Sequence, residues 1–313
     1  MNRIKLVLIV LSMNVSIQLC WAQIFYINFR IQTETDVNHS LEVVEVQQID
    51  SLHISGYKNE FDLDFGRFAN LSYCEIYSDT IANVPDQLFS LPRLSHLYFS
   101  SYKPLIYLPE PLRNNYSIKE FGMYFELNEH NISVLESMDS IRKLQIDGSF
   151  IPYLQYVTGL KYLDISCSKN ELKYFYAASG YFSQLQGLAI RSEHCINLNQ
   201  IKCPALKYLY LFEKHKFDPT NPPSFLTQIT KLRLARISDR KCENLDILYA
   251  CPNVDSLEIG YFKVKTSALD CKKVPNLELI EISWFDSKLI NDQFRCPNLR
   301  VVRKSYQNKK SVL

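Results

Sequence analysis

Apolar residues recur along most of the chain in the pattern apolar-x-x-apolar-x-apolar, whose three apolar positions are called the first, middle and third slots. The first slots are Ile49, Leu71, Leu94, Ile118, Ile141, Leu160, Leu185, Leu206, Ile229, Val254, Leu277 and Leu299. They lie 19 to 25 residues apart, about 23 on average. In a chain that is 47% hydrophobic about 17 of the 36 slots would be apolar by chance, whereas 35 are, with Lys304 the exception. Alternate apolar residues are typical of a strand with one buried face, so the pattern predicts twelve repeats with one short strand each.

Several of these segments resemble the leucine-rich repeat family, among them LPRLSHLYF (91–99), CPALKYLYL (203–211) and CPNVDSLEI (251–259). The resemblance covers residues 46 to about 304. It implies an α/β repeat fold, a curved solenoid with a parallel β-sheet on the concave face and irregular loops and short helices on the convex face. The family usually has Asn three residues after the third slot, but this chain has other residues there, such as Tyr57 and Asp79. We therefore expect irregular convex loops and an imperfect horseshoe.

The first 22 residues have the features of a secretory signal peptide. Arg3 and Lys5 precede an apolar stretch from Leu6 to about Ile17, and the segment ends in Ala22. That stretch is shorter than the roughly 20 residues that span a bilayer. We expect cleavage after Ala22 and a periplasmic or extracellular protein, as in exported bacterial proteins with such signals. A lipid-modified Cys20 fits less well.

The rest of the chain divides into three parts by this interpretation. Residues 23–48 are expected to be an N-terminal cap, with an edge strand at 24–31. Residues 49–304 form the repeat domain, and 305–313 form a polar C-terminal tail. A cap is needed because the end of a repeat stack would otherwise expose its core.

Eight of the nine cysteines lie after the signal segment, and most are expected to be core thiols. Five fall at positions that other repeats fill with apolar residues: Cys74, Cys195, Cys203, Cys251 and Cys296. Cys167, Cys242 and Cys271 lie outside this scheme, and a disulfide between Cys242 and Cys271 stays open. The chain has no Cys-x-x-Cys pair, so a zinc site is not expected.

The residues that flank the buried slots of each strand point to the concave face. Seven of these 36 positions are Tyr, against about two expected from 20 Tyr in 313 residues. Two candidate ligand-binding patches follow. The acidic-aromatic patch contains Tyr73, Glu75, Tyr77, His96, Tyr98, Glu120 and Tyr124. The basic-aromatic patch contains Arg191, Tyr208, Tyr210, Phe212, Lys231 and Arg233. The alternative is that Tyr, which favours strands, only covers an exposed sheet.

Motifs for catalysis and for cofactors are missing from the sequence. It has no His-Glu-x-x-His, no Gly-x-Ser-x-Gly and no Gly-rich phosphate loop, and only eight Gly in all. Asp147 and Asp164 lie on adjacent rows but are expected to be solvated charges. We expect no enzyme activity, no metal and no cofactor. Sequons at Asn38, Asn70, Asn115 and Asn131 would matter only in a eukaryote.

The sequence therefore predicts an exported binding module that recognises a protein or peptide through its concave sheet. A glycan-binding solenoid and a structural envelope protein without a discrete ligand are the alternatives. With 35 Lys and Arg against 33 Asp and Glu, the formal charge is +2, which does not suggest a nucleic-acid partner. No segment after the signal is apolar for long enough to span a membrane. The oligomeric state is not encoded in any of these patterns.

Overall fold

The computed structural model describes residues 7–11, 14–18, 24–28, 46–56, 63–78, 84–101, 107–113, 115–123, 125, 128–157, 159–212, 215–234, 246–262, 270, 272–285 and 297–305. The chain divides into two compact units, Met1–Gly159 (unit 1) and Leu160–Leu313 (unit 2).

Unit 1 contains a sheet of parallel strands that follow one another in chain order. They are β3 (Ile24–Asn28), β4 (Ser51–Ser55), β5 (Tyr73–Ser78), β6 (His96–Ser101), β7 (Glu120–Gly122) and β8 (Lys143–Asp147). The connections carry the 3-10 helices η1 (Val46–Gln48), η2 (Phe65–Arg67), η3 (Asp86–Ser90), η4 (Glu110–Leu112) and η5 (Gly148–Tyr156), and helix α2 (Glu129–Glu136). The strand expected at 24–31 is present as β3, which pairs with β4.

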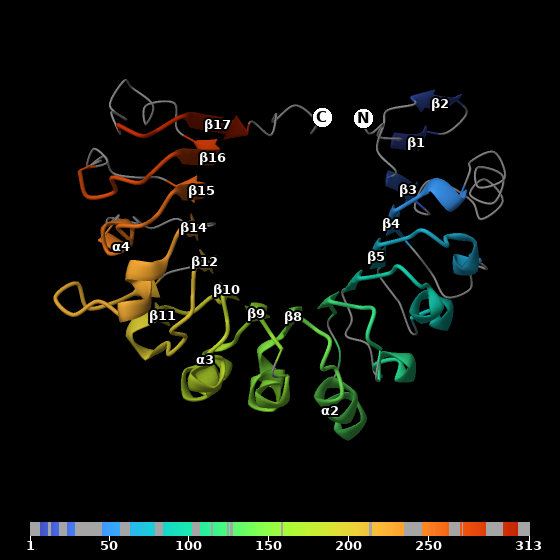
Figure 1. Cartoon of the computed structure of the whole chain (residues 1–313), viewed down its shortest axis with the longest axis horizontal. Coiled ribbons are helices and arrows are strands. Elements are labelled where there is room, and N and C mark those ends of the chain that lie inside the picture. Colours follow the sequence, from blue (N-terminus) through green and yellow to red (C-terminus); the bar gives the residue numbers. More distant parts are fainter. Residues whose placement is uncertain are drawn as a thin grey trace. The chain divides into compact units, whose positions relative to one another are not determined.

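Unit 2 repeats this arrangement with strands β9 (Tyr162–Ser166), β10 (Gly187–Arg191), β12 (Tyr208–Leu211), β14 (Lys231–Leu234), β15 (Ser256–Phe262), β16 (Leu279–Phe285) and β17 (Val301–Ser305). Its helices are α3 (Lys169–Ala178), η6 (Ser179–Tyr181), η7 (Leu198–Gln200), η8 (Ser224–Gln228) and α4 (Asp246–Tyr249). A small parallel pair joins β11 (Ile196–Asn197) to β13 (His215–Lys216). In each unit the helices lie along one side of the sheet, and the other side is called its open face (Figure 1).

The predicted slots form the core of both units. The middle slots Leu52, Cys74, Leu97, Phe121 and Leu144 are in register across unit 1, and Leu163, Leu188, Leu209, Leu232, Leu257, Ile280 and Val302 are in register across unit 2. Where the side chain is described, every slot is at most 5% exposed, except Leu299, which is intermediate. Identical spacing in neighbouring repeats brings like slots side by side, so each side chain buries its neighbour in the next repeat.

A ladder of shared carbonyls holds the starts of the strands in register. The carbonyl of Asp50 accepts hydrogen bonds from the backbone N–H groups of Ser72 and Tyr73 at 2.8 and 3.1 Å. In the same way, two consecutive backbone N–H groups donate to each of the carbonyls of Ser72, Ser95, Lys119, Lys161, Gln186, Lys207, Thr230 and Asp255. Each buried donor at a strand entry thereby finds a partner, as buried backbone groups require.

Asparagines stabilise the repeats at a position that the sequence analysis did not consider, one residue before the first slot. The side-chain amides of Asn70, Asn253 and Asn298 donate to the carbonyls of Gln47, Thr227 and Pro275, each in the preceding repeat, at 2.5, 2.7 and 2.7 Å. Asn276 donates to the Pro252 carbonyl in the same way at 3.5 Å. These bonds tie each of the four repeats to the one before it.

The cysteine predictions are confirmed at three positions and wrong at one. Cys74, Cys203 and Cys251 are buried free thiols, and burial raises the pKa of the latter two to about 12. Cys195, expected in the core, is exposed, because its neighbour Ile196 takes the buried position. Cys167, which fitted no slot, is buried. Cys242, Cys271 and Cys296 lie outside the described residues.

The amino-terminal segment stays a predicted signal peptide. Within it the structure describes β1 (Val7–Leu11) and β2 (Asn14–Gln18), which pair antiparallel. In the part of the chain that is described, no helix has both the length and the apolar character to cross a membrane.

Candidate functional site

The open face of each sheet carries the residues that alternate with the core. In β4, β5 and β8 buried and half-exposed side chains alternate along the whole strand. The half-exposed set includes most of both predicted patches. Parallel pairing in register then brings the same position of successive repeats together, so side chains 22 or 23 residues apart meet.

Aromatic rings form a continuous row on the open face of unit 1. The imidazole of His53 stacks on the Tyr26 ring, with 4.8 Å between ring centroids and 15° between planes. On its other side His53 contacts Tyr73 at 5.1 Å. Tyr73 in turn contacts Tyr98 at 5.8 Å and His96 at 6.1 Å. The row thus crosses strands β3 to β6.

Two carboxylates fix these rings. Glu75 accepts a hydrogen bond from the Tyr73 hydroxyl at 3.1 Å, and its Oε2 lies 3.0 Å from Nδ1 of His53. The hydrogen bond with His53, partly opposed by burial and aided by Tyr73, lowers the pKa of Glu75. The carboxylate is therefore ionised at neutral pH.

Glu120 is the second of these carboxylates and binds three groups. It accepts hydrogen bonds from the Tyr98 hydroxyl at 2.6 Å and from Nζ of Lys143 at 2.9 Å, and its Oε1 lies 3.5 Å from Nε2 of His96. Burial acts to raise the pKa of Glu120, but these partners outweigh it and the pKa is lowered. Burial and the nearby carboxylates raise the pKa of the Tyr73 and Tyr98 hydroxyls, so both stay neutral donors.

Glycine makes room for the largest of these rings. A Cβ atom built on Gly122 would lie 2.5 Å from Cδ1 of Tyr98. Gly122 is the register partner of Tyr98 on the next strand. The Tyr98 ring therefore leans across β7, in a position that a side chain at residue 122 would block.

The open face of unit 2 has a row of six groups in the order carboxylate, arginine, ring, ring, arginine, carboxylate. They are Asp164, Arg191, Phe212, Tyr210, Arg233 and Glu258. On one side Arg191 donates to both oxygens of Asp164, at 3.0 Å from Nε and 2.6 Å from Nη2. The Arg191 guanidinium also lies over the Phe212 ring, 4.1 Å from its centroid. A planar guanidinium can do both at once because its edge carries the donors and its face the π contact.

The other half of the row is arranged in the opposite order. Nε of Arg233 lies 2.7 Å from Oε1 of Glu258, and its guanidinium lies 4.2 Å from the Tyr210 ring centroid. Tyr210 and Phe212 close the row, with 4.0 Å between their centroids. Burial, only partly offset by the two arginines, raises the pKa of Tyr210 to about 12. Both arginines of the predicted basic-aromatic patch are thus paired with carboxylates that the prediction did not include.

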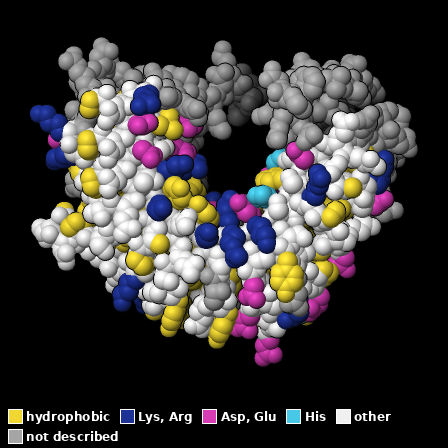
Figure 2. Space-filling model, viewed as in Figure 1, with side chains coloured by type: hydrophobic (Ala, Val, Ile, Leu, Met, Phe, Trp, Pro, Cys, Tyr) yellow, Lys and Arg dark blue, Asp and Glu magenta, His cyan; other side chains and the backbone are white. Residues whose placement is uncertain are grey.

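A second glycine positions Tyr162 in unit 2. Gly187 pairs with Tyr162 on one side and Tyr208 on the other, and a Cβ on Gly187 would lie 2.3 Å from Cδ1 of Tyr162. The two Tyr rings stack across it, 5.8 Å apart and 16° from parallel. Nζ of the exposed Lys231 lies 5.3 Å from the Tyr208 ring. Figure 2 shows hydrophobic, Lys/Arg and Asp/Glu side chains next to one another on the open faces.

Comparison with known proteins gives remote structural likeness only. No protein-family model matches the sequence, and no curated protein matches it. An internalin (inlF) from Listeria monocytogenes is 15% identical over 74% of this chain and 72% of its own, with a TM-score of 0.40. The TLR13 structure with ssRNA13 is 13% identical, over 90% and 46%, with 0.44. A leucine-rich repeat protein from Leptospira interrogans is 12% identical, over 79% and 92%, with 0.28.

Because their TM-scores are below 0.5, these structures are not used to assign the fold. The fold is assigned from the slots, which are in register across both units. The chain has a leucine-rich repeat fold. Its parallel strands, one per repeat, and its helices on one side of each sheet are those that the resemblance implied.

Most of the predicted site residues lie on the open face of these leucine-rich repeats, in two separate groups. Tyr73, Glu75, Tyr77, His96, Tyr98 and Glu120 belong to unit 1, and Arg191, Tyr208, Tyr210, Phe212, Lys231 and Arg233 to unit 2. Tyr124 lies outside the described residues. The prediction omitted His53, Lys143, Tyr162, Asp164 and Glu258, which contact the predicted residues, and Tyr26, which stacks on His53. For Lys143, Asp164 and Glu258 the signal was present as a residue of opposite charge on the neighbouring row, such as Glu120 beside Lys143.

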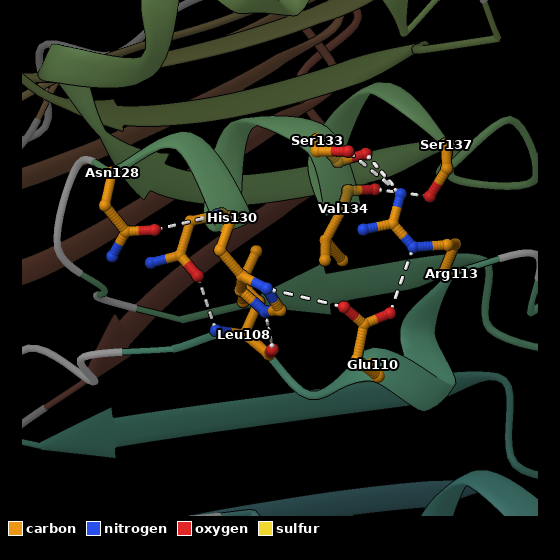
Figure 3. A network of polar contacts seen from close by, with 9 residues as sticks. Leu108, Glu110, Arg113, Asn128, His130, Ser133, Val134 and Ser137 are labelled. Atoms are coloured by element: carbon orange, nitrogen blue, oxygen red, sulfur yellow. Dashed lines mark hydrogen bonds and ion pairs between the residues drawn. The ribbon is translucent and has the colours of Figure 1, made fainter.

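A further polar cluster lies on the helix side of unit 1, between η4 and α2 (Figure 3). Glu110 lies 3.0 Å from Nε of Arg113 and 3.4 Å from Nδ1 of His130. Arg113 also donates to the Ser133 carbonyl and hydroxyl, and Nε2 of His130 lies 2.8 Å from the Leu108 carbonyl. These bonds attach the segment before β7 to helix α2, which is a structural role.

The buried Asn131 completes this attachment. Its side-chain oxygen accepts a hydrogen bond from the Leu108 backbone N–H at 2.6 Å, and the residue is fully buried. The amides of Asn70 and Asn115 also bond to backbone carbonyls. The three described sequon asparagines therefore have structural roles as hydrogen-bond partners of the backbone. Among the described residues no group of three His, Cys, Asp or Glu is placed to hold a metal ion.

Proposed function

We propose that the open faces of the leucine-rich repeats bind another macromolecule, a protein or peptide, and that the protein does so after export. The observation that carries the proposal is the row of half-exposed aromatic rings on each face. In unit 1 carboxylates bind the ring hydroxyls at 2.6 and 3.1 Å. In unit 2 the rings contact arginines that are themselves paired with carboxylates. Tyr and Arg dominate the energetics of protein interfaces. Rings that are already fixed lose little conformational entropy on binding, so they favour affinity.

The two glycines favour a second candidate, a glycan. Tyr98 and Tyr162 lean over Gly122 and Gly187, and a sugar could stack on such rings while carboxylates bind its hydroxyls. A glycan array with the wild-type chain and the Tyr98→Ala and Tyr162→Ala variants tests this candidate. Binding of a defined glycan that both variants lose would favour it over a protein partner.

The test of the main proposal is chemical cross-linking in the compartment of origin, followed by affinity measurement with the recovered partner. Tyr98→Ala in unit 1 and Tyr210→Ala in unit 2 remove central rings, and we expect affinity to fall by about tenfold or more, as at interface hot spots. Tyr116→Ala and Tyr181→Ala are matched controls, since these rings are 69% and 67% exposed and lie off the open faces. Unchanged affinity in both open-face variants would refute the proposal.

A further inference from the structure

The open face of unit 1 already holds cationic groups of its own in contact with aromatic rings and carboxylates. Lys143 bonds to Glu120, and its Nζ lies 5.5 Å from the Tyr98 ring centroid. His53 lies between two tyrosine rings and beside Glu75. A ring face next to a carboxylate is an arrangement that attracts cations. The side chains of unit 1 thus show which chemistry this face accepts.

The charged groups around the Tyr73 and Tyr98 rings leave room for one more cation. Glu75 and Glu120 contribute two negative charges there and Lys143 one positive charge. The lowered pKa values of both carboxylates keep them ionised. The whole chain has a formal charge of +2, so the negative charge here is a local feature.

Protonation of two histidines would reverse the sign of that charge. His53 faces Tyr26 on β3, Tyr73 and Glu75 on β5, and Ser51 on its own strand. Among the described residues, Glu75 is the charged group that it contacts. The added proton would place a full positive charge against that carboxylate.

His96 faces a similar set of groups. These are Tyr73 on β5, Glu120 on β7 and its neighbour Ser95, and Lys143 on β8 shares Glu120. Nδ1 of His96 lies 2.7 Å from Oγ of Ser95, and Nε2 faces Glu120. An added proton would thus place a positive charge against that carboxylate, and two such protons would add two positive charges beside Glu75 and Glu120.

We propose that the open face of unit 1 binds a Lys or Arg side chain of its partner against Tyr73, Tyr98, Glu75 and Glu120, and that protonation of His53 and His96 releases it. This inference rests on the proposed function, because it names the partner chemistry of the same face. Histidine side chains gain their proton between about pH 5 and 8, so mild acidification is the trigger. In unit 2 Arg191 and Arg233 already neutralise Asp164 and Glu258 and keep their charge at any physiological pH.

The experiment measures fluorescence anisotropy of two labelled peptides, (Arg-Gly)4 and (Glu-Gly)4, with the full chain at pH 7.5 and 5.5 and constant ionic strength. We expect the Arg peptide to bind at pH 7.5 and to bind at least tenfold more weakly at pH 5.5, and the Glu peptide to bind at neither pH. The double variant Glu75→Gln/Glu120→Gln should lose the binding at pH 7.5. Glu136→Gln, which removes an exposed carboxylate of helix α2 away from the open face, is the control and should leave it unchanged.

The double variant His53→Gln/His96→Gln isolates the switch. The ratio of its affinities for the Arg peptide at pH 7.5 and 5.5 should be close to one, whatever its affinity at pH 7.5, whereas the wild-type ratio should be at least ten. Equal affinity of the wild type at both pH values, or for both peptides, would overturn the inference. If Tyr98→Ala abolishes binding of the native partner while the wild type does not bind the Arg peptide, this inference fails and the proposed function stands. If neither result is obtained, both fail.

Discussion

The open faces of the two units use the same three kinds of group, a carboxylate, a cation and an aromatic ring, but different cations. Unit 1 has His53, His96 and Lys143, whereas unit 2 has Arg191 and Arg233. An imidazole changes its charge near neutral pH and a guanidinium does not. If the face of unit 1 responds to pH as we propose, the type of cation decides that response more than the number of carboxylates does.

The carboxylates of the two faces also differ in the direction of their pKa. Three groups bind Glu120, and its pKa is lowered. Burial raises the pKa of Glu258, Arg233 lowers it in part, and Glu281 on the next strand raises it further. The ionised form of Glu258 therefore stabilises the protein less than that of Glu120, although Glu258 lies only 2.7 Å from Nε of Arg233.

The largest expected effects come from the two glycines on which Tyr98 and Tyr162 rest. Gly122→Ala and Gly187→Ala would place a Cβ within 2.5 and 2.3 Å of a ring carbon, so the ring must move. We expect the free energy of unfolding to fall by about 1–3 kcal/mol in each, as for overpacked sites. Urea denaturation measures it. Gly180→Ala is the control, since its Cβ would have no neighbour within 4 Å. Variants as stable as this control would show that the rings are not confined.

Removing one carboxylate charge from each unit should change the free energy of unfolding in different directions. Glu120→Gln loses charge-assisted bonds from Tyr98 and Lys143 and should destabilise the protein by about 1 kcal/mol at pH 7. Because the pKa of Glu120 is lowered on folding, its contribution is present above about pH 4.5 and is lost as the pH falls through the folded value. Urea unfolding at pH 7 and pH 4 should show this difference shrink in acid.

Glu258→Gln should behave in the reverse way. Its pKa is raised on folding, so its stabilising contribution is present below the unfolded pKa and is lost as the pH rises through the folded value. At pH 7 the substitution should be neutral or slightly stabilising in the same urea titration. A loss as large as that of Glu120→Gln would contradict the difference between the faces.

The core of both units could be predicted from the sequence because period-two alternation repeated at a nearly constant spacing. Such a pattern permits one register only, and the buried middle slots from Leu52 to Ile280 follow it. The helix side could not be predicted in the same way, since loop lengths differ between repeats. Ile151, ten residues after its first slot, is buried, whereas Cys195 at the same offset is exposed.

The candidate site was predicted as a surface but not as a set of contacts. Alternation decides which side chains reach the open face, and it placed Tyr98 and Arg233 there. It does not decide their rotamers, so the pairing of Arg233 with Glu258 and the contact of Tyr98 with Gly122 could not be read from spacing. The charge of a patch depends on such pairs, so Asp164 and Glu258 reduce the positive charge that the second patch was predicted to have.

The smallest expected effect tests the geometry of the cations directly. Arg191→Lys keeps the charge but loses the two-pronged bond to Asp164 and the stacking on Phe212, so we expect a loss of about 0.5 kcal/mol in the free energy of unfolding. Lys143→Arg, the reverse exchange in unit 1, replaces a single bond to Glu120 and should change stability by less. Both follow from urea denaturation at pH 7. Equal effects would mean that the two faces differ only in titration. They would also mean that the planar guanidinium of Arg191 contributes no stability beyond its charge through Asp164 and Phe212.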